Sequence, residues 1–476
     1  MKSIFASILV LAALSCSSKS KNDSTGTTPV TPPIAAVDSV SYWVTDPANN
    51  LLFLKRTVAQ RAANNAAGTI AIDPATTYQT VDGFGYALTG GSAQHLSAMS
   101  TAARQAFLTE LFDSTNGLGV SYLRISIGAS DLDTTPFSYD DLPVGVTSDS
   151  SLQYFSISKE QQALIPILKQ ILQINPNIKI LGSPWSPPTW MKDNNSTIGG
   201  SLRTDCYQVY AQYFVKYIQA MKAQGITLDA ITVQNEPLNP ANNPSLSMTA
   251  VQQLTFVKTA LGPTFQRNGI ATKIIVYDHN ADHTDYPVTV LSDPDAAKYV
   301  DGSAFHLYLG SVDAIGPVHD QFPQKNLYFT EQWVGAPGNL SSDLVWHTEN
   351  IIIGTMRNWC KTALEWNLSS NPTLTPHTPG GCDQCLGAVT INGDNVTRNS
   401  AYYIIAQASK LVRPGSVRIA SNTLTSLPNV AFKRPDGKIV LIVLNKNTSA
   451  TTFNISLNNK IFSTSINPGS VETIVL

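Results

Sequence analysis

Short apolar, β-branched runs alternate with amphipathic segments through the middle of this 476-residue chain. Such alternation is typical of βα units, in which a helix covers the strand before it. The runs predict strands at 80–84, 120–126, 178–183, 230–234, 272–277, 302–305, 326–330 and 362–366. Residues 158–174 and 207–222 have helical spacing, and Gly225 is expected to end the second helix. Eight parallel strands with intervening helices predict an α/β fold, the (β/α)₈ TIM barrel.

The flanks of this region have a different pattern. Residues 38–78 contain two apolar stretches separated by Asn49-Asn50, a turn signal. Residues 405–476 contain short strands joined by turns such as Asp436-Gly437. We therefore expect a barrel at 79–404 and a side β-sandwich built from both flanks.

The N-terminal residues predict export. The apolar run 4–14 follows Lys2 and has the length of a signal-peptide core, too short to cross a bilayer. It ends at Ala13-Leu14-Ser15-Cys16, which resembles a bacterial lipobox. We expect a signal peptide at 1–15 and lipidation of Cys16; an ordinary secretory signal with an incidental cysteine is the alternative. The polar segment 16–37 has no apolar period and predicts a disordered linker.

These features predict an exported lipoprotein of a bacterial outer membrane, on its cell-surface or periplasmic face. No later run of 18 apolar residues follows, so we expect membrane contact only through the N-terminal lipid. Net charge is −2, charged residues make up 13%, and basic residues do not cluster, which argues against nucleic acid as a partner. A neutral sugar polymer suits this composition. We expect a monomer, although the sequence leaves the oligomeric state open.

Four cysteines follow Cys16, and in an exported protein an even number suggests disulfides. Cys382 and Cys385 lie in a turn-rich loop rather than at a helix start, which argues against a thioredoxin-like motif. A zinc site would need a second close-spaced pair. We predict a local Cys382–Cys385 disulfide, with Cys206–Cys360 as a weaker second pairing.

Polar and aromatic residues gather just after the predicted strands. In a (β/α)₈ barrel these C-terminal strand ends share one face, where the chemistry takes place. The candidate residues are Arg124, Trp185, Asn235, Glu236, His279, His306, Tyr308, Glu331, Trp333 and Trp366. Acids for chemistry and indoles for sugar faces predict a carbohydrate site.

Glycoside hydrolysis requires two carboxyl groups that flank one bond. About three βα units separate Glu236 from Glu331, so strands 4 and 7 would place them across the barrel mouth. This spacing is consistent with a retaining enzyme, in which one carboxylate attacks the anomeric carbon and the other protonates the leaving oxygen. A glutamate before a proline is, taken alone, often only a loop boundary.

The neighbours suggest distinct roles for the two glutamates. Arg124, Asn235 and Tyr308 are candidates to keep a nucleophile at position 331 ionised. Trp185 and Trp366 are candidates for an apolar wall that keeps an acid at position 236 protonated. Asn235 is also placed to hold a sugar 2-hydroxyl.

Other motifs have weaker interpretations. His279 and His283 are four apart, as metal ligands can be, but no third ligand accompanies them, so His279 is more readily a hydrogen-bonding residue. Asp131 and Asp133 are candidates for a metal or sugar contact, or for capping a loop. The sequence as a whole implies neither a metal nor an organic cofactor, and we predict none.

The chain resembles glycoside hydrolase family 30, the glucosylceramidase-like clan, over roughly residues 40–476. The motifs that carry the resemblance are Asp82–Gly85, Arg124–Gly128, Ser183–Lys192, Val233–Pro237, Asp278–Asn280 and Thr330-Glu331. The resemblance implies a barrel with a side β-sandwich and a retaining double displacement, with Glu236 as acid/base and Glu331 as nucleophile. It also implies that Arg124, Asp131, Trp185, Asn235, Tyr308 and Trp366 line the sugar subsite.

One departure bears on the substrate. Many glucosylceramidase-like members have an acidic residue where this chain has Gly90. Glycine at this position, together with the loop at 380–385, makes the chain more similar to the endo-β-1,6-glucanase branch of the family. We therefore expect an endo-β-1,6-glucanase, with an exo-acting β-glucosidase or glucosylceramidase as the alternative. A non-catalytic carbohydrate-binding lipoprotein would be expected to lack one carboxylate, and both are present.

Overall fold

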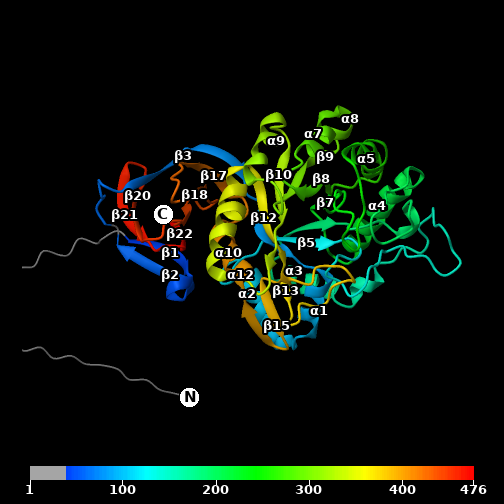
Figure 1. Ribbon diagram of the computed structural model, residues 1–476, viewed down its shortest axis with the longest axis horizontal. Helices are drawn as coiled ribbons and strands as arrows, with labels where there is room; N and C mark the ends of the chain where they lie inside the picture. Colours follow the sequence, from blue (N-terminus) through cyan, green and yellow to red (C-terminus); the bar gives the residue numbers. More distant parts are fainter. Residues whose placement is uncertain (1–38, 60) are drawn as a thin grey trace, which may run out of the picture. The chain divides into compact units, whose positions relative to one another are not determined.

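The computed structural model describes residues 39–59 and 61–476 (Figure 1). The predicted signal peptide, the predicted lipidation site Cys16 and the predicted linker lie outside these residues. Within Ser39–Leu476, a barrel and a β-sandwich lie beside each other, as the sequence predicts.

Eight parallel strands close the barrel in the order β10-β12-β4-β5-β6-β7-β8-β9. In chain order these are β4 Gly83–Ala87, β5 Tyr122–Ser126, β6 Lys179–Ser183, β7 Ala230–Thr232, β8 Lys273–Asn280, β9 Val300–His306, β10 Asn326–Glu331 and β12 Cys360–Asn367. Each predicted strand overlaps one of them, so the barrel is confirmed. The first strand begins at Gly83 rather than Thr80, because Thr80 is the last residue of sandwich strand β3 (Gly68–Thr80).

Helices surround the barrel. They are α1 Gly90–Ala98, α2 Thr101–Phe112, α3 Leu164–Ile174, α4 Tyr207–Ala223, α5 Ala250–Phe256, α6 Gly262–Arg267, α7 Asp285–Ser292, α8 Pro294–Ala297, α9 Gly316–Gln321, α10 Leu340–His347, α11 Thr355–Arg357 and α12 Ser400–Ser409, with π-helical turns at Val257–Leu261 and Thr348–Gly354. The second predicted helix is α4, and Gly225 follows it with φ 81°, a conformation that favours glycine. The predicted boundary at 404/405 falls within α12.

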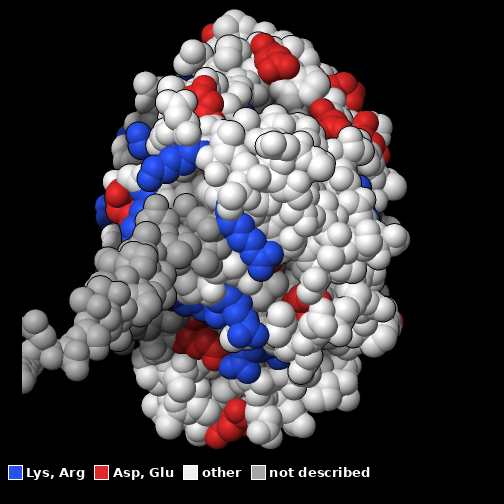
Figure 2. All heavy atoms as spheres, turned by 90° about the vertical axis from the view of Figure 1, so that its left-hand side faces the viewer, with Lys and Arg blue, Asp and Glu red and all other residues white. Residues whose placement is uncertain are grey.

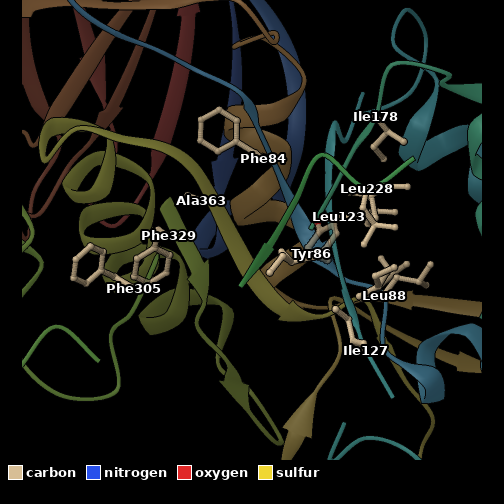
Figure 3. Close-up of a cluster of buried hydrophobic side chains, with 14 of the residues drawn as sticks. Phe84, Tyr86, Leu88, Leu123, Ile127, Ile178, Leu228, Phe305, Phe329 and Ala363 are labelled. Atoms are coloured by element: carbon tan, nitrogen blue, oxygen red, sulfur yellow. The ribbon is translucent and has the colours of Figure 1, made fainter. Parts of the chain in front are cut away.

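Alternation of side chains along the strands fills the barrel from within. One interior layer consists of Tyr122, Leu181, Ala230, Ile275, Ala304, Tyr328 and Leu364, each from a different strand. Strand β4 contributes no side chain to it, because a Cβ at Gly85 would lie 1.9 Å from the Tyr122 carbonyl oxygen. The opposite faces of the strands pack outward. On these outward faces the side chains of Phe84, Tyr86 and Leu123 are fully buried (Figure 3).

Two positions further along several strands, the interior changes from apolar to polar. Arg124, Ser183, Thr232, His306 and Thr330 follow members of the apolar layer by two residues and are buried. This polar layer lies at the C-terminal end of the barrel and forms the floor of the candidate site.

The sandwich is one continuous nine-stranded sheet, β2-β1-β22-β19-β18-β17-β3-β20-β21. Its strands are β1 Ser39–Asp46, β2 Leu51–Ala59, β3 Gly68–Thr80, β17 Val417–Ser421, β18 Asn429–Lys433, β19 Ile439–Leu444, β20 Thr451–Leu457, β21 Lys460–Ile466 and β22 Val471–Val475. Because β1 pairs with β22, both ends of the described chain meet in one sheet. Strand β21 and the part of β3 before Thr80 are additions to the prediction. A separate apolar core, which includes Ile70, Leu441 and Phe453, stabilises this part.

The surface agrees with the low charge of the sequence. On the face that Figure 2 shows, most atoms belong to uncharged residues, and Lys and Arg side chains stand singly or in short groups. The described residues visible on this face form no continuous basic surface of the kind that nucleic acid requires. Among the described residues, no helix is long and apolar enough to span a membrane.

Candidate active site

A cavity of about 560 Å³ opens at the C-terminal ends of the barrel strands. Nine of the predicted site residues line it: Asp131, Trp185, Asn235, Glu236, His279, Tyr308, Glu331, Trp333 and Trp366. Arg124 and His306 are fully buried beneath it and contact the lining residues. The barrel thus brings together side chains that are far apart in the sequence.

Glu331, the last residue of β10, is held by donors on both oxygens. Oε2 pairs with Nη1 of Arg124, and Oε1 accepts a hydrogen bond from the Tyr308 hydroxyl at 2.8 Å. Both oxygens of the Glu331 carboxyl group therefore have a donor, which fixes the orientation of the group. A fixed orientation is what a nucleophile requires.

The Arg124 guanidinium connects the nucleophile candidate to the rest of the floor. Its Nη2 donates to Asn235 Oδ1 at 2.6 Å and to Asp278 Oδ2 at 2.8 Å, and its Nε donates to Ser183 Oγ at 3.1 Å. Since the Asn235 oxygen is occupied by Arg124, its NH₂ group remains to donate to a sugar hydroxyl.

Asp278 is the centre of the polar layer. Its carboxylate accepts hydrogen bonds from the hydroxyls of Thr232 and Thr330 at 2.7 and 2.6 Å, in addition to contacts with Arg124, Ser183 and His306. Burial raises the pKa of this carboxyl, but the Arg124 charge and these hydrogen bonds outweigh burial and hold the pKa far below its usual range. Asp278 is therefore a permanent anion beneath the site.

Sequence reasoning noted the motif that contains Asp278 but did not name it as a site residue. It enters the barrel interior because β8 is irregular at its end. Tyr277 and Asp278 have φ of 73° and 68°, and the register against β9 shifts between Tyr277 and His279. A bulge of this kind turns a side chain away from strict alternation, which an alternating pattern does not reveal.

Glu236 follows β7 in a strained loop. Its φ is 45°, unusual for a residue with a side chain, and its N–H donates to the Asp278 carbonyl at 2.9 Å. Oε1 lies 3.2 Å from Nδ1 of His306 and 3.6 Å from Nδ1 of His279. Oε2 accepts a hydrogen bond from Asn239 at 2.8 Å, a contact that sequence reasoning missed.

His306 lies between the two glutamates. Its Nδ1 is 3.2 Å from Glu236 Oε1 and 3.8 Å from Glu331 Oε1. Because these lengths add to 7.0 Å, the two carboxylate oxygens cannot be farther apart than that. A retaining pair has carboxyl groups about 5 Å apart, and this bound admits that spacing.

The ionisation of Glu236 and His306 differs from what is expected of a catalytic acid. Burial alone raises the pKa of Glu236, but the imidazoles of His279 and His306 outweigh it and hold the pKa below its usual value. Burial lowers the pKa of His306, but Glu331, Asp278 and Glu236 outweigh that effect and raise the pKa to about 9. The proton between Glu236 and His306 therefore lies on the imidazole.

The prediction that Trp185 and Trp366 form an apolar wall that keeps Glu236 protonated is wrong. The Trp185 and Trp366 rings lie against each other, with centroids 5.5 Å apart, and the Arg124 guanidinium lies 4.9 and 5.6 Å from their centroids. These indoles pack on the cation that binds the other glutamate, because the floor beneath Glu236 is polar. Both still line the cavity, where they offer ring faces to a sugar.

Asp131 and Asp133 have separate environments. Asp131 lines the cavity, and burial, with Glu331 as the next cause, raises its pKa to about 7. Asp133 lines a different cavity and accepts hydrogen bonds from the backbone N–H and the hydroxyl of Ser130. A Cβ at Gly90 would lie 1.7 Å from Asp133 Oδ1, so an acidic side chain at position 90 has no room here.

Among the residues that the structure describes, one set of potential metal ligands comes together. Atoms of Glu236, His279 and His306 lie within 4.8 Å of one another, whereas His283 is largely exposed and not part of the set. Both nitrogens of His306 already face carboxylates. A metal ion bound there would replace the hydrogen bond between His306 and Glu236, so the prediction of a metal-free site stays a prediction.

The cysteines follow the prediction in part. Cys382 and Cys385 form a disulfide, with Cα atoms 5.7 Å apart, and both line the cavity. The weaker pairing is wrong, because Cys206 and Cys360 are both free and buried. Cys206 precedes α4 and Cys360 begins β12, and each packs within the apolar core instead.

A (β/α)₈ barrel with two carboxylates across its mouth, an arginine and a tyrosine on one of them, and indoles around them defines a glycoside hydrolase. Sequence comparison agrees with this class. The glycosyl hydrolase family 30 TIM-barrel domain matches residues 81–412, and the family 30 β-sandwich domain matches residues 415–474. The chain belongs to glycosyl hydrolase family 30.

Relatives fall into two groups. An endo-1,6-β-D-glucanase of Aspergillus fumigatus is 36% identical over 77% of this chain and 78% of its own length. The lysosomal acid glucosylceramidase of Mus musculus is 30% identical over 85% of this chain and 82% of its own length. A solved endo-β1,6-glucanase is 38% identical and superposes with a TM-score of 0.85, covering 92% of this chain and 99% of its own.

Proposed function

We propose that this family 30 enzyme is a retaining endo-β-1,6-glucanase with Glu331 as nucleophile and Glu236 as acid/base. The observation that carries the proposal is the contrast between the two glutamates. Glu331 has a fixed cation and a hydroxyl donor on its oxygens, whereas Glu236 shares a proton with His306. One group is thus prepared to attack and the other to exchange a proton.

The first half of the reaction breaks the glycosidic bond. A Glu331 oxygen forms a bond to the anomeric carbon while the bond from that carbon to the leaving oxygen breaks, and Glu236 gives its proton to that oxygen. In the second half, Glu236 takes a proton from water, and the water oxygen displaces Glu331 from the anomeric carbon. The configuration at that carbon is inverted twice and so retained.

Transfer of the shared proton prepares Glu236 to act as an acid. His306 Nε2 donates to the permanent anion Asp278, so the proton free to move is the one between Nδ1 and Glu236 Oε1. A sugar that excludes water from the cavity disfavours separated charges on the pair. The neutral pair, with the proton on Glu236, is then favoured, and that proton faces the leaving group.

The preference for β-1,6-glucan is supported by the relatives and by Gly90. The two endo-1,6-β-glucanases compared above are 36% and 38% identical to this chain, more than the glucosylceramidase. The space that an acidic residue at position 90 would need is occupied by Asp133. The alternative, an exo-acting β-glucosidase or glucosylceramidase, is supported by the 30% identity to the mouse enzyme.

Product sizing distinguishes these functions. We expect residues 38–476 to release mixed oligosaccharides from β-1,6-glucan at the first time points, and the Glu331→Gln variant to release none. Glucose as the sole early product would favour the exo-acting alternative. Cleavage of glucosylceramide but not of β-1,6-glucan would overturn the glucanase proposal.

We also propose that the enzyme is an outer-membrane lipoprotein that acts as a monomer. The support is the lipobox-like sequence that ends at Cys16 and the polar segment after it. In cells fed a radiolabelled fatty acid, the full-length chain is expected to take up label and the Cys16→Ser variant none. Label in that variant, or none in the parent, would contradict the anchor.

A further inference from the structure

The Cys382–Cys385 disulfide forms part of the wall of the active-site cavity. Both cysteines line it, together with Asp131, Trp333 and Trp366. Double displacement at Glu236 and Glu331 makes no use of a disulfide. Its position therefore calls for a separate explanation.

The Cys382 end of the loop contacts Asp131. The backbone N–H of Cys382 donates to Asp131 Oδ2 at 3.3 Å. The N–H of Thr378, in the same loop, donates to the Asp131 carbonyl at 2.9 Å. A Cβ at Gly381 would lie 2.5 Å from that carbonyl oxygen, so the loop backbone packs directly on Asp131.

The Cys385 end is attached to a different part of the barrel mouth. Strand β14 (Cys385–Leu386) pairs with β11 (Val334–Gly335), just after the nucleophile strand. The N–H of Ala336 donates to the Gln384 carbonyl at 2.8 Å. Cys385 packs in one apolar cluster with Trp185 and Trp366, and Trp333 and Cys382 pack against that cluster.

The disulfide thus closes a short loop that contacts two walls of the cavity, one at each end. One wall carries Asp131, on the segment after β5, and the other carries Trp333, on the segment after β10. Asp131 is 5% exposed, and its carboxylate accepts a hydrogen bond from the backbone N–H of Cys382. Loss of the bond between the sulfur atoms would remove the covalent restraint on the chain from Gly381 to Gln384 and leave its contact with Asp131 to hydrogen bonds and packing.

We propose that the Cys382–Cys385 disulfide is a positioning element that holds Asp131 in place to bind the sugar. The inference rests on the proposed function of this cavity, in which Asp131 contacts a sugar hydroxyl. Its consequence is that sugar affinity depends on the oxidation state of this cysteine pair. A displacement of about 1 Å at a substrate-positioning group costs up to about 100-fold in rate, so the effect is large enough to measure.

Titration of a glucose-configured iminosugar, followed by tryptophan fluorescence, tests the inference without requiring turnover. Dithiothreitol transfers two electrons and two protons to the cysteine pair and is itself oxidised to a cyclic disulfide. Cys382–Cys385 is the only disulfide among residues 39–59 and 61–476, so reduction acts at one place in this part of the chain. We expect the Kd to rise about 10-fold or more on reduction, the change that corresponds to loss of one hydrogen bond to a charged group.

Two variants make the test specific. The Cys382→Ser/Cys385→Ser double variant is expected to have the weaker Kd and no response to dithiothreitol. In Asp131→Asn, reduction is expected to change the Kd less than about 2-fold, because the group that the disulfide positions has already been altered. A general loosening of the fold would add to the effect of Asp131→Asn instead.

A fully reduced wild-type protein whose Kd stays within about 2-fold of the oxidised protein would overturn the inference, as would an undiminished response in Asp131→Asn. Thiol labelling confirms that reduction is complete, and thermal unfolding confirms that the variants fold. The same oxidised sample incubated with β-1,6-glucan reports separately on the proposed function, so a failure of one is not mistaken for a failure of the other.

Discussion

The imidazole of His306 donates from Nε2 to Asp278 Oδ1 at 3.1 Å, and this bond decides what its other nitrogen does. Asp278 is kept anionic by Arg124 and several hydroxyls. Nε2 therefore keeps its proton, and Nδ1 is left to exchange one with Glu236. The acid of this enzyme is best regarded as a pair of residues that share one proton.

The pH profile of kcat/KM should reveal this pair. His306 has a raised pKa, so the shared proton is present below that pKa and is lost as the pH rises through it. The alkaline limb of wild type should therefore lie well above the ordinary pKa of a glutamate. In His306→Gln the limb should move to lower pH. His319→Gln, at a histidine outside the cavity, is the control, and an unmoved limb in His306→Gln would contradict the shared proton.

Removal of the acid should affect substrates unequally. In Glu236→Ala, the hydrolysis of β-1,6-glucan should fall about 10²- to 10⁴-fold, because its leaving oxygen needs a proton. Formation of the glycosyl-enzyme from 2,4-dinitrophenyl β-glucoside should be nearly unaffected, since dinitrophenolate leaves unprotonated. Azide should restore turnover and yield the β-glucosyl azide. Equal losses on both substrates, with no azide product, would assign Glu236 another role.

The tyrosine on the nucleophile offers a smaller, graded test. In Tyr308→Phe, Glu331 loses the 2.8 Å hydrogen bond on Oε1 and keeps its pairing with Arg124. A hydrogen bond to a charged group contributes about 1.5–3 kcal/mol, so kcat/KM should fall about 10- to 100-fold. Steady-state kinetics on an aryl β-glucoside measure this change. A loss below 2-fold would mean that the hydroxyl does not support the nucleophile.

A buried acid in the sandwich should limit stability in alkali. Burial, with Asp46 as a second cause, raises the pKa of Glu472 to about 8. An acid whose folded pKa is raised binds its proton more tightly when folded, so stability falls as the pH rises from the unfolded pKa towards about 8. Glu472→Gln should therefore be nearly neutral at pH 5 and stabilising at pH 9, on the order of a few kcal/mol.

Thermal unfolding of wild type and Glu472→Gln at both pH values measures this difference. Glu349→Gln, at an acid paired with Lys446 near the surface, is a suitable control and should show no such gain in alkali. A melting temperature of Glu472→Gln that tracks wild type at every pH would contradict the assignment.

Patterns along the chain predicted the barrel well because strands and helical segments alternate regularly in this part of the sequence. The positions of Arg124 and Glu331 at strand ends followed from the fold, since all parallel strands end at the same face. The cysteine pair at 382 and 385 was predictable because a four-residue loop places both thiols within reach of each other. Cys206 and Cys360 were not, because distance in the folded chain cannot be read from spacing.

The electrostatic environment of the active site was less predictable from the sequence. Strict alternation does not place Asp278 inside the barrel, because a bulge at the end of β8 changes the direction of its side chain. Without Asp278 inside the barrel, the contacts of His306 with Glu236 and Asp278 could not be predicted. Strand β21 was missed because Lys460–Ile466 (KIFSTSI) is short, lies on an edge of the sheet and does not alternate between apolar and polar residues.

Covalent trapping tests the central claim most directly. A 2-deoxy-2-fluoro-β-glucosyl fluoride slows breakdown of the intermediate, so a retaining enzyme accumulates a glycosyl adduct that mass spectrometry locates. We predict one adduct per chain, on the peptide that contains Glu331, and none in Glu331→Gln. An adduct on a different residue, or turnover of the fluoride without any adduct and with inversion at the anomeric carbon, would contradict the account.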